Sequence, residues 1–156
     1  MVPGRALRFV LGAVSLVGGL TWILLNLHSR SVGVDVAVGT VLTVGGLVLL
    51  MPHRIRLPRA ATAVATTVFA LGGTAAGLLV ARSQVCCDVA YITDRGWPFH
   101  WAQQGALAAD ADTAYRLAQS ASWTVDVLTL AVDLLLWSYV GLILVVIAVM
   151  ARRRAN

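Results

Sequence analysis

The chain has 156 residues, of which 59% are hydrophobic and only 12% are charged. A soluble domain carries roughly 25% charged residues, so this composition argues against a water-soluble protein. The net charge is +5 and all twelve basic residues are arginine, but the arginines flank apolar runs and form no basic stripe with interleaved aromatic residues. We therefore expect a lipid bilayer as the partner and no nucleic acid.

Four apolar runs are long enough to cross a bilayer as helices. The first follows a short basic N-terminus, and its length and the absence of a small-x-small cleavage motif after it favour a retained helix over a signal peptide. A basic loop over 52–59 contains two prolines, which end helices. The expected spans are residues 9–27, 32–51, 60–81 and 124–150. The sequence predicts an all-α fold: one integral membrane domain over 1–156, built as a bundle of four transmembrane helices.

The long segment 82–122 between the third and fourth spans is expected to be a loop. Its second half is rich in alanine, and four small or apolar residues recur there at helical spacing: Leu107, Ala111, Ala114 and Ala118. This spacing predicts a short surface helix within the loop.

The distribution of arginines predicts how the chain is oriented. Cytoplasmic loops of membrane proteins carry an excess of Lys and Arg. Eight arginines flank the spans on one side and four on the other. The larger group is Arg5, Arg8, Arg54, Arg56, Arg59, Arg152, Arg153 and Arg154, and the smaller is Arg30, Arg82, Arg95 and Arg116. Both termini are therefore expected in the cytoplasm and the loop 82–122 outside the cell membrane.

Cys86 and Cys87 are adjacent in this loop. Neighbouring Cα atoms lie about 3.8 Å apart, whereas ordinary disulfides need roughly 4.4 to 6.8 Å, so a bond between them would be strained. Three hypotheses stay open: two small residues that pack the loop, a vicinal or intermolecular disulfide, and a thiol redox pair. Zinc sites usually separate paired cysteines by two to four residues, so no metal and no cofactor are expected.

An aromatic turn follows the cysteines. Pro98 favours an extended Trp97, and the glycine before Trp97 accepts positive φ. Three aromatic residues alternate along an extended segment and should share one face, so the turn is expected to act as a lid on the bundle. His100 would point the other way, as a hydrogen-bonded residue or a pH switch. The candidate lid residues are Arg95, Trp97, Pro98 and His100.

Acidic residues within spans are costly and need a reason. Asp126 and Asp133 are seven positions apart and should share one helix face. Asp133 lies deeper, at about the depth of Thr21, Thr40 and Thr74, which predicts one polar layer. Asp35 lies near the outer rim, within reach of Arg30, Arg82 or His28. The candidate polar or ion site is therefore Asp133, Asp126 and Asp35, and the alternative is a structural aspartate that fixes helix packing.

The four-helix layout with a Cys-Cys…Arg-Gly-Trp-Pro-Phe loop over 86–99 resembles a loose set of actinobacterial membrane proteins. The resemblance implies a multi-pass membrane protein and no particular activity. Disulfide-forming quinone oxidoreductases need two separate cysteine pairs, and small multidrug exporters need a glutamate in the first helix. This chain has one adjacent cysteine pair and no glutamate, so neither family fits.

Three functions follow as hypotheses. The first is a non-enzymatic envelope protein that binds a membrane-protein partner or assembles as a homo-oligomer. The second is a small transporter or proton-coupled carrier that uses Asp133 and Asp126. The third is a thiol redox protein that uses Cys86 and Cys87.

Overall fold

The computed structural model describes residues 3–29, 31–51, 58–86 and 89–155. It contains four long helices, α1 (Pro3–Leu25), α2 (Val32–Leu50), α3 (Arg59–Gly77) and α5 (Val127–Ala155). Each is long and apolar enough to cross a membrane, so the four predicted spans are confirmed as helices of that kind. The chain divides into two compact units, Met1–Ala70 with Leu135–Asn156 and Leu71–Leu134.

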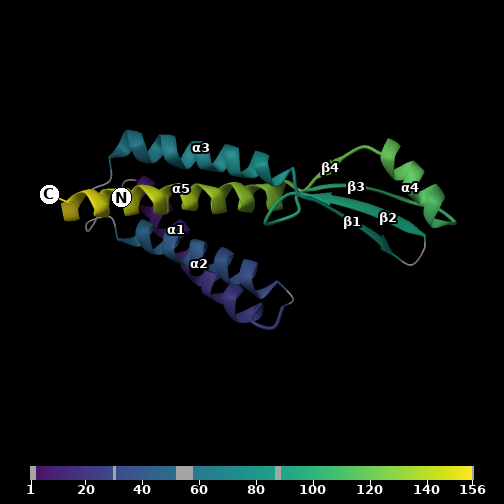
Figure 1. Cartoon of the computed structure of the whole chain (residues 1–156). Coiled ribbons are helices and arrows are strands. Elements are labelled where there is room, and N and C mark those ends of the chain that lie inside the picture. Colours follow the sequence, from purple (N-terminus) through teal and green to yellow (C-terminus); the bar gives the residue numbers. More distant parts are fainter. Residues whose placement is uncertain (1–2, 30, 52–57, 87–88, 156) are drawn as a thin grey trace. The chain divides into compact units, whose positions relative to one another are not determined.

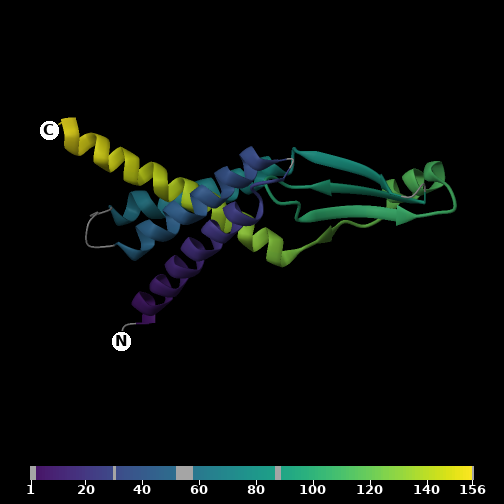
Figure 2. The same ribbon diagram turned by 90° about the horizontal axis from the view of Figure 1, so that it is seen from below.

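The prediction of an all-α fold with a long loop is wrong. A four-stranded antiparallel sheet occupies much of the segment after α3, with strands β1 (Ala81–Cys86), β2 (Ala90–Arg95), β3 (Ala102–Leu107) and β4 (Thr124–Val125) in that order. Figure 1 labels these strands and the short helix α4 (Ala111–Ser120), and Figure 2 shows β1, β2 and β3 side by side. Backbone pairing between neighbouring strands outweighs the helix preference of alanine and glutamine in β3.

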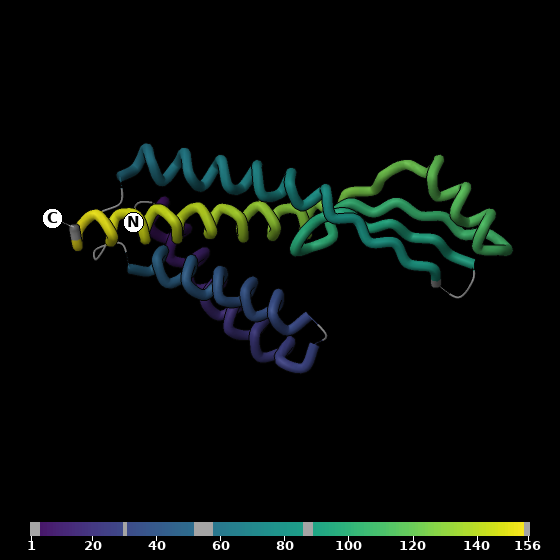
Figure 3. Tube along the Cα trace, in the orientation of Figure 1, coloured from purple at the N-terminus to yellow at the C-terminus, as the bar shows by residue number. Residues whose placement is uncertain are grey.

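Glycines set the spacing of α1 and α2, which form the hairpin visible in Figure 3. A Cβ added to Gly46 would lie 2.6 Å from the carbonyl oxygen of Gly12, and one added to Gly19 would lie 2.6 Å from the carbonyl oxygen of Gly39. The two glycines of each helix are seven positions apart and share one face. Small residues let the two backbones approach closely, which is how helices associate in lipid.

Helix α5 packs in the same unit against all three other long helices. The Tyr139 hydroxyl shares a buried hydrogen bond of 2.7 Å with Ser15 on α1. A Cβ on Gly45 of α2 would lie 2.5 Å from the Tyr139 ring, and a Cβ on Gly141 would lie 2.7 Å from the Ala65 carbonyl oxygen of α3. Small residues therefore position Tyr139 and the last helix as they position the hairpin.

In the second unit, α4 covers one face of the sheet. Ala114 and Ala118 on α4 are buried, and the rings of Tyr115 and Tyr91 meet edge to face at 4.9 Å. The Gln104 side-chain amide donates to the Ala121 carbonyl at 2.6 Å. The predicted surface helix is confirmed over Ala111–Ser120, but Leu107, which was assigned to the same helical pattern, lies in β3.

Candidate functional site

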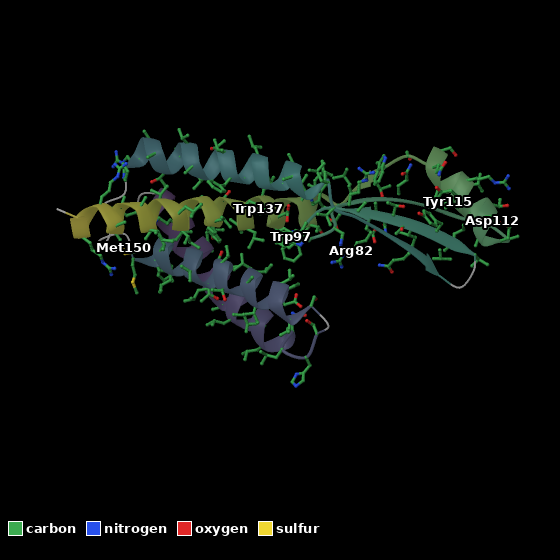
Figure 4. The ribbon with its side chains drawn as sticks, viewed as in Figure 1. Arg82, Trp97, Asp112, Tyr115, Trp137 and Met150 are labelled. Carbon is green, nitrogen blue, oxygen red and sulfur yellow. The ribbon has the colours of Figure 1, made fainter. Side chains whose placement is uncertain are left out.

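The loop between β2 and β3, residues 96–101, lies against the C-terminal end of α3. Gly96 has φ +124°, a conformation that favours glycine, and a Cβ on Gly77 would lie 2.8 Å from the Trp97 carbonyl oxygen. The expected extended segment with three aromatic residues on one face is wrong, because the chain bends over residues 97–99. Trp97, labelled in Figure 4, is exposed. The Trp101 indole nitrogen is buried.

This loop closes over Asp133, whose exposed fraction is 0%. Three donor groups face its carboxylate: the Phe99 backbone N–H, the Thr74 hydroxyl on α3 and the Trp101 indole N–H. Within the described part of the chain, neither Asp133 oxygen completes a hydrogen bond, nor does Thr74 Oγ1 or Trp101 Nε1. Four buried polar atoms from three parts of the second unit thus meet at one place without satisfying one another.

Burying these four polar atoms without complete hydrogen bonds costs free energy. A buried carboxylate is stabilised by a paired cation or by well-formed hydrogen bonds, and an incomplete set of partners is costly. The donors at this position suit an anionic carboxylate or a small polar molecule held between them. Among the described residues, no three His, Cys, Asp or Glu side chains gather to hold a metal ion.

The predicted polar layer around Asp133 is only partly present. Thr74 is 6% exposed and faces Asp133. Thr21 and Thr40 are exposed on their helices and belong to no buried layer. The depth argument from the sequence therefore identified one of three threonines, because depth along a helix does not specify which face of the helix a residue occupies.

Asp126 caps α5. Its carboxylate accepts hydrogen bonds from the backbone N–H groups of Leu128 and Thr129, both at 3.0 Å, and from the Thr129 hydroxyl at 2.8 Å. The backbone N–H of Thr129, and then its hydroxyl, hold the pKa of Asp126 below its ordinary value. The spacing of Asp126 and Thr129 at the start of an apolar run is a helix-start signal that sequence reasoning missed.

Asp35 has a similar local role at the start of α2. Its carboxylate accepts hydrogen bonds from the hydroxyls of Ser29 and Ser31, the latter at 2.9 Å. Arg30, one of its predicted partners, lies outside the described residues, and His28 is exposed. The three predicted acids therefore occupy three separate environments in the structure.

The remaining candidates lie in or beside the sheet. Cys86 ends β1, and Cys87 lies outside the described residues, so the predicted chemistry of the pair falls outside what the structure describes. His100 is exposed in the loop. The guanidinium of Arg95 stacks over the Trp123 ring with 5.3 Å to its centroid, a cation–π contact.

The face of the sheet opposite α4 carries a pocket of about 450 Å³ that sequence reasoning missed. Its lining includes Ile92, Gln103, Gly105, Leu107, Ser122 and Thr124, and the described residues that line it carry no charged side chain. A pocket of this volume is within the range that small ligands and peptide segments occupy. The sequence carried no signal for it, because the residues come from strands that were expected to be loop.

Fold and site together define a class: a chain with four helices apolar enough to cross a membrane and a small sheet module between the third and the last of them. Comparisons with known protein families, with curated proteins and with solved structures found no match.

Proposed function

We propose that this chain is a multi-pass protein of the cell membrane whose sheet module lies outside the cytoplasm and binds a partner. The module is β1 to β4 with α4. The observation that carries the proposal is the sheet face opposite α4, where a pocket of about 450 Å³ opens between β2, β3 and the segment that leads to β4, and the described residues that line it are uncharged. A sheet that served only to close a bundle would gain nothing from an open face with its own pocket.

The arginine distribution supports the orientation. Eight arginines flank the spans on the side of the two termini and four on the side of the sheet, and positive charge favours the cytoplasm. Labelling of Cys86 and Cys87 in intact cells with a membrane-impermeant maleimide tests this orientation. Labelling without permeabilisation is expected, and labelling that requires permeabilisation contradicts it.

Binding is tested by photo-cross-linking in living cells. A photoreactive amino acid replaces Gln103, which lines the pocket, and in a matched variant replaces Gln119, which is exposed on α4. The proposal expects a discrete cross-linked product from position 103 and none from position 119. Equal products from both positions, or none from either, would contradict binding at the open face.

A second candidate function, a proton-coupled carrier, is favoured by one specific observation. Asp133 is fully buried with both carboxylate oxygens unsatisfied among the described residues. Intramembrane acids of this kind mark proton and ion pathways in transporters. Asp126 supports the carrier hypothesis less than Asp133 does, because its carboxylate caps α5.

Flux measurements in liposomes test the carrier. Asp133→Asn keeps the size of the side chain and removes its proton exchange, so proton flux should fall to background while the protein still folds. The matched control is Asp112→Asn on the exposed surface of α4, which should leave flux unchanged. Equal flux from wild type and Asp133→Asn would eliminate this candidate.

A further inference from the structure

One third of the outer edge of β3 is paired, two residues of six. The two-residue strand β4 pairs only with Ala102 and Gln103. Beyond that point β3 continues through Leu107, paired on its other side with β2 along its whole length. Ser122, which precedes β4, lines the pocket, but no described strand continues the ladder beside Gly105 and Leu107.

The direction of the backbone groups in β3 follows from the hydrogen bonds at its two ends. The N–H of Ala108 donates to the Val89 carbonyl, which is on the β2 side. The carbonyl of Gln103 accepts from the Thr124 hydroxyl, which is on the β4 side. Backbone groups of alternate residues in an antiparallel strand point to opposite edges. Gly105 and Leu107 therefore direct their N–H and C=O groups to the open edge, and both residues also line the pocket.

The described side chains that line the pocket are uncharged. Ile92 and Leu107 give the pocket apolar walls, and Gln103, Ser122 and Thr124 give it amide and hydroxyl groups. Leu107 is 77% exposed, an unusual fraction for a leucine on a sheet without a partner. Unpaired strand edges are the usual templates on which a second chain adds a strand.

We propose that the pocket beside Gly105 and Leu107 binds an extended peptide segment of a partner protein, which adds a strand to β3 in continuation of β4. This proposal rests on the proposed function and specifies its ligand. The backbone of the peptide is recognised by the N–H and C=O groups of Gly105 and Leu107. Its side chains are uncharged, to match the uncharged side chains of the described residues that line the pocket.

The geometry sets the length of the bound segment. Strands rise about 3.4 Å per residue, so the unpaired edge from Gln104 to Leu107 spans roughly 10 Å and pairs with about four peptide residues. Backbone pairing of this kind supplies affinity, and pockets for alternate side chains supply specificity. The apolar walls then favour small or β-branched apolar side chains at alternate positions of the peptide.

Amide hydrogen exchange of the full chain in lipid nanodiscs tests the proposal. The probe is a blocked hexapeptide of alternating valine and threonine at millimolar concentration. Before the peptide is added, the amides of Gly105 and Leu107 should exchange faster than those of Gln104 and Ala106. The peptide should slow exchange at Gly105 and Leu107 by about tenfold or more, because each amide gains a partner.

Two matched controls separate strand addition from other binding. The same hexapeptide with alternate backbone nitrogens methylated keeps its side chains and loses donors, so it should give no protection. Leu107→Pro removes the N–H at the open edge and is compatible with an edge strand, whereas Leu107→Ala keeps the N–H. Protection should disappear with proline and remain with alanine. Equal protection by the methylated peptide, or by a detergent alkyl chain alone, would overturn the proposal.

The cross-linking and hydrogen-exchange results together distinguish strand addition at β3 from partner binding by the sheet module in general. A cross-link at Gln103 without peptide-induced protection at Gly105 and Leu107 would leave the binding module standing and would reject strand addition. Protection by the peptide without any cross-link in cells would support the site and would contradict its use for a partner in the envelope.

Discussion

Ser15 and Tyr139 share a hydrogen bond of 2.7 Å although 124 positions separate them in the sequence. Ser15 is 6% exposed and Tyr139 is 3% exposed, so the bond lies inside the packed helices. It joins the first helix of the chain to the last, and both side chains are buried. A buried polar group that loses its partner bears its full desolvation cost, which makes this bond a sensitive place to test the fold.

Tyr139→Phe should lower the free energy of unfolding by about 1–3 kcal/mol, because it leaves the Ser15 hydroxyl buried without this partner. Denaturant titration in detergent micelles measures the change. Tyr115→Phe, at an exposed position on α4, should have little effect. Adding Ser15→Ala to Tyr139→Phe should recover part of the loss, and a double variant whose loss equals the sum of the single losses would argue against a direct interaction.

Gly46→Ala should destabilise the α1–α2 hairpin by about 1–3 kcal/mol, because its new methyl group would lie 2.6 Å from a backbone oxygen of α1. Gly18→Ala is the control, since no heavy atom lies within 4 Å of a Cβ at that position. It should be neutral or stabilising through helix propensity. Thermal unfolding in detergent measures both variants, and an equal loss of stability in the two would disprove the close approach of the helices.

Asp126 predicts a dependence of stability on pH. Its folded-state pKa is held below the ordinary value by hydrogen bonds from Thr129. The stabilisation is therefore fully present above the unfolded-state pKa of about 4, and it is lost as the pH falls through the folded-state value. Asp126→Asn keeps a capping side chain and removes this titration.

The pH effect is measured as the difference in melting temperature between wild type and Asp126→Asn from pH 7 down to pH 2. The difference should favour wild type at pH 7 and shrink as the pH falls below 4. A difference that stays constant over this range would mean that the Asp126 carboxylate does not contribute through its charge.

Ala114→Leu should displace α4 from the sheet, because Ala114 has an exposed fraction of 0% and the larger side chain finds no space. Overpacking of this kind costs about 1–3 kcal/mol. Hydrogen exchange should become faster in α4 while exchange in α1 and α2 stays unchanged. Gln119→Leu places the same side chain at an exposed position of α4 and should leave exchange in that helix as it is.

The helices were predictable and the sheet was not, for reasons visible in particular residues. Uninterrupted apolar runs of about 20 residues have few alternatives to a membrane helix. The strand Ala102–Leu107 consists of alanine, glutamine, glycine and leucine, which lack the β-branched alternation of a half-buried strand. It is a strand because β2 pairs with it, and pairing between distant segments leaves no trace in local composition. Ile92 and Thr93, beside Tyr91 in β2, were the clearest available signal.

The candidate site was also predictable only in part. Asp133 was identified from the cost of an acid inside a span, an argument that needs only one residue and its depth. Its neighbours Phe99 and Trp101 come from the turn between two strands, so they could be connected to Asp133 only after the sheet was known. Asp126 was assigned to the same site because seven positions separate the two acids, whereas its place just before α5 makes it a cap.

The register of the sheet brings its entrance and its exit to one end. Ala81, at the start of β1, pairs with Arg95, Arg95 pairs with Ala102, and Ala102 pairs with Val125, at the end of β4. Four strands about 4.8 Å apart place the first and last of these residues about 14 Å from each other. A segment whose two ends emerge so close together can connect two neighbouring helices without forcing them apart.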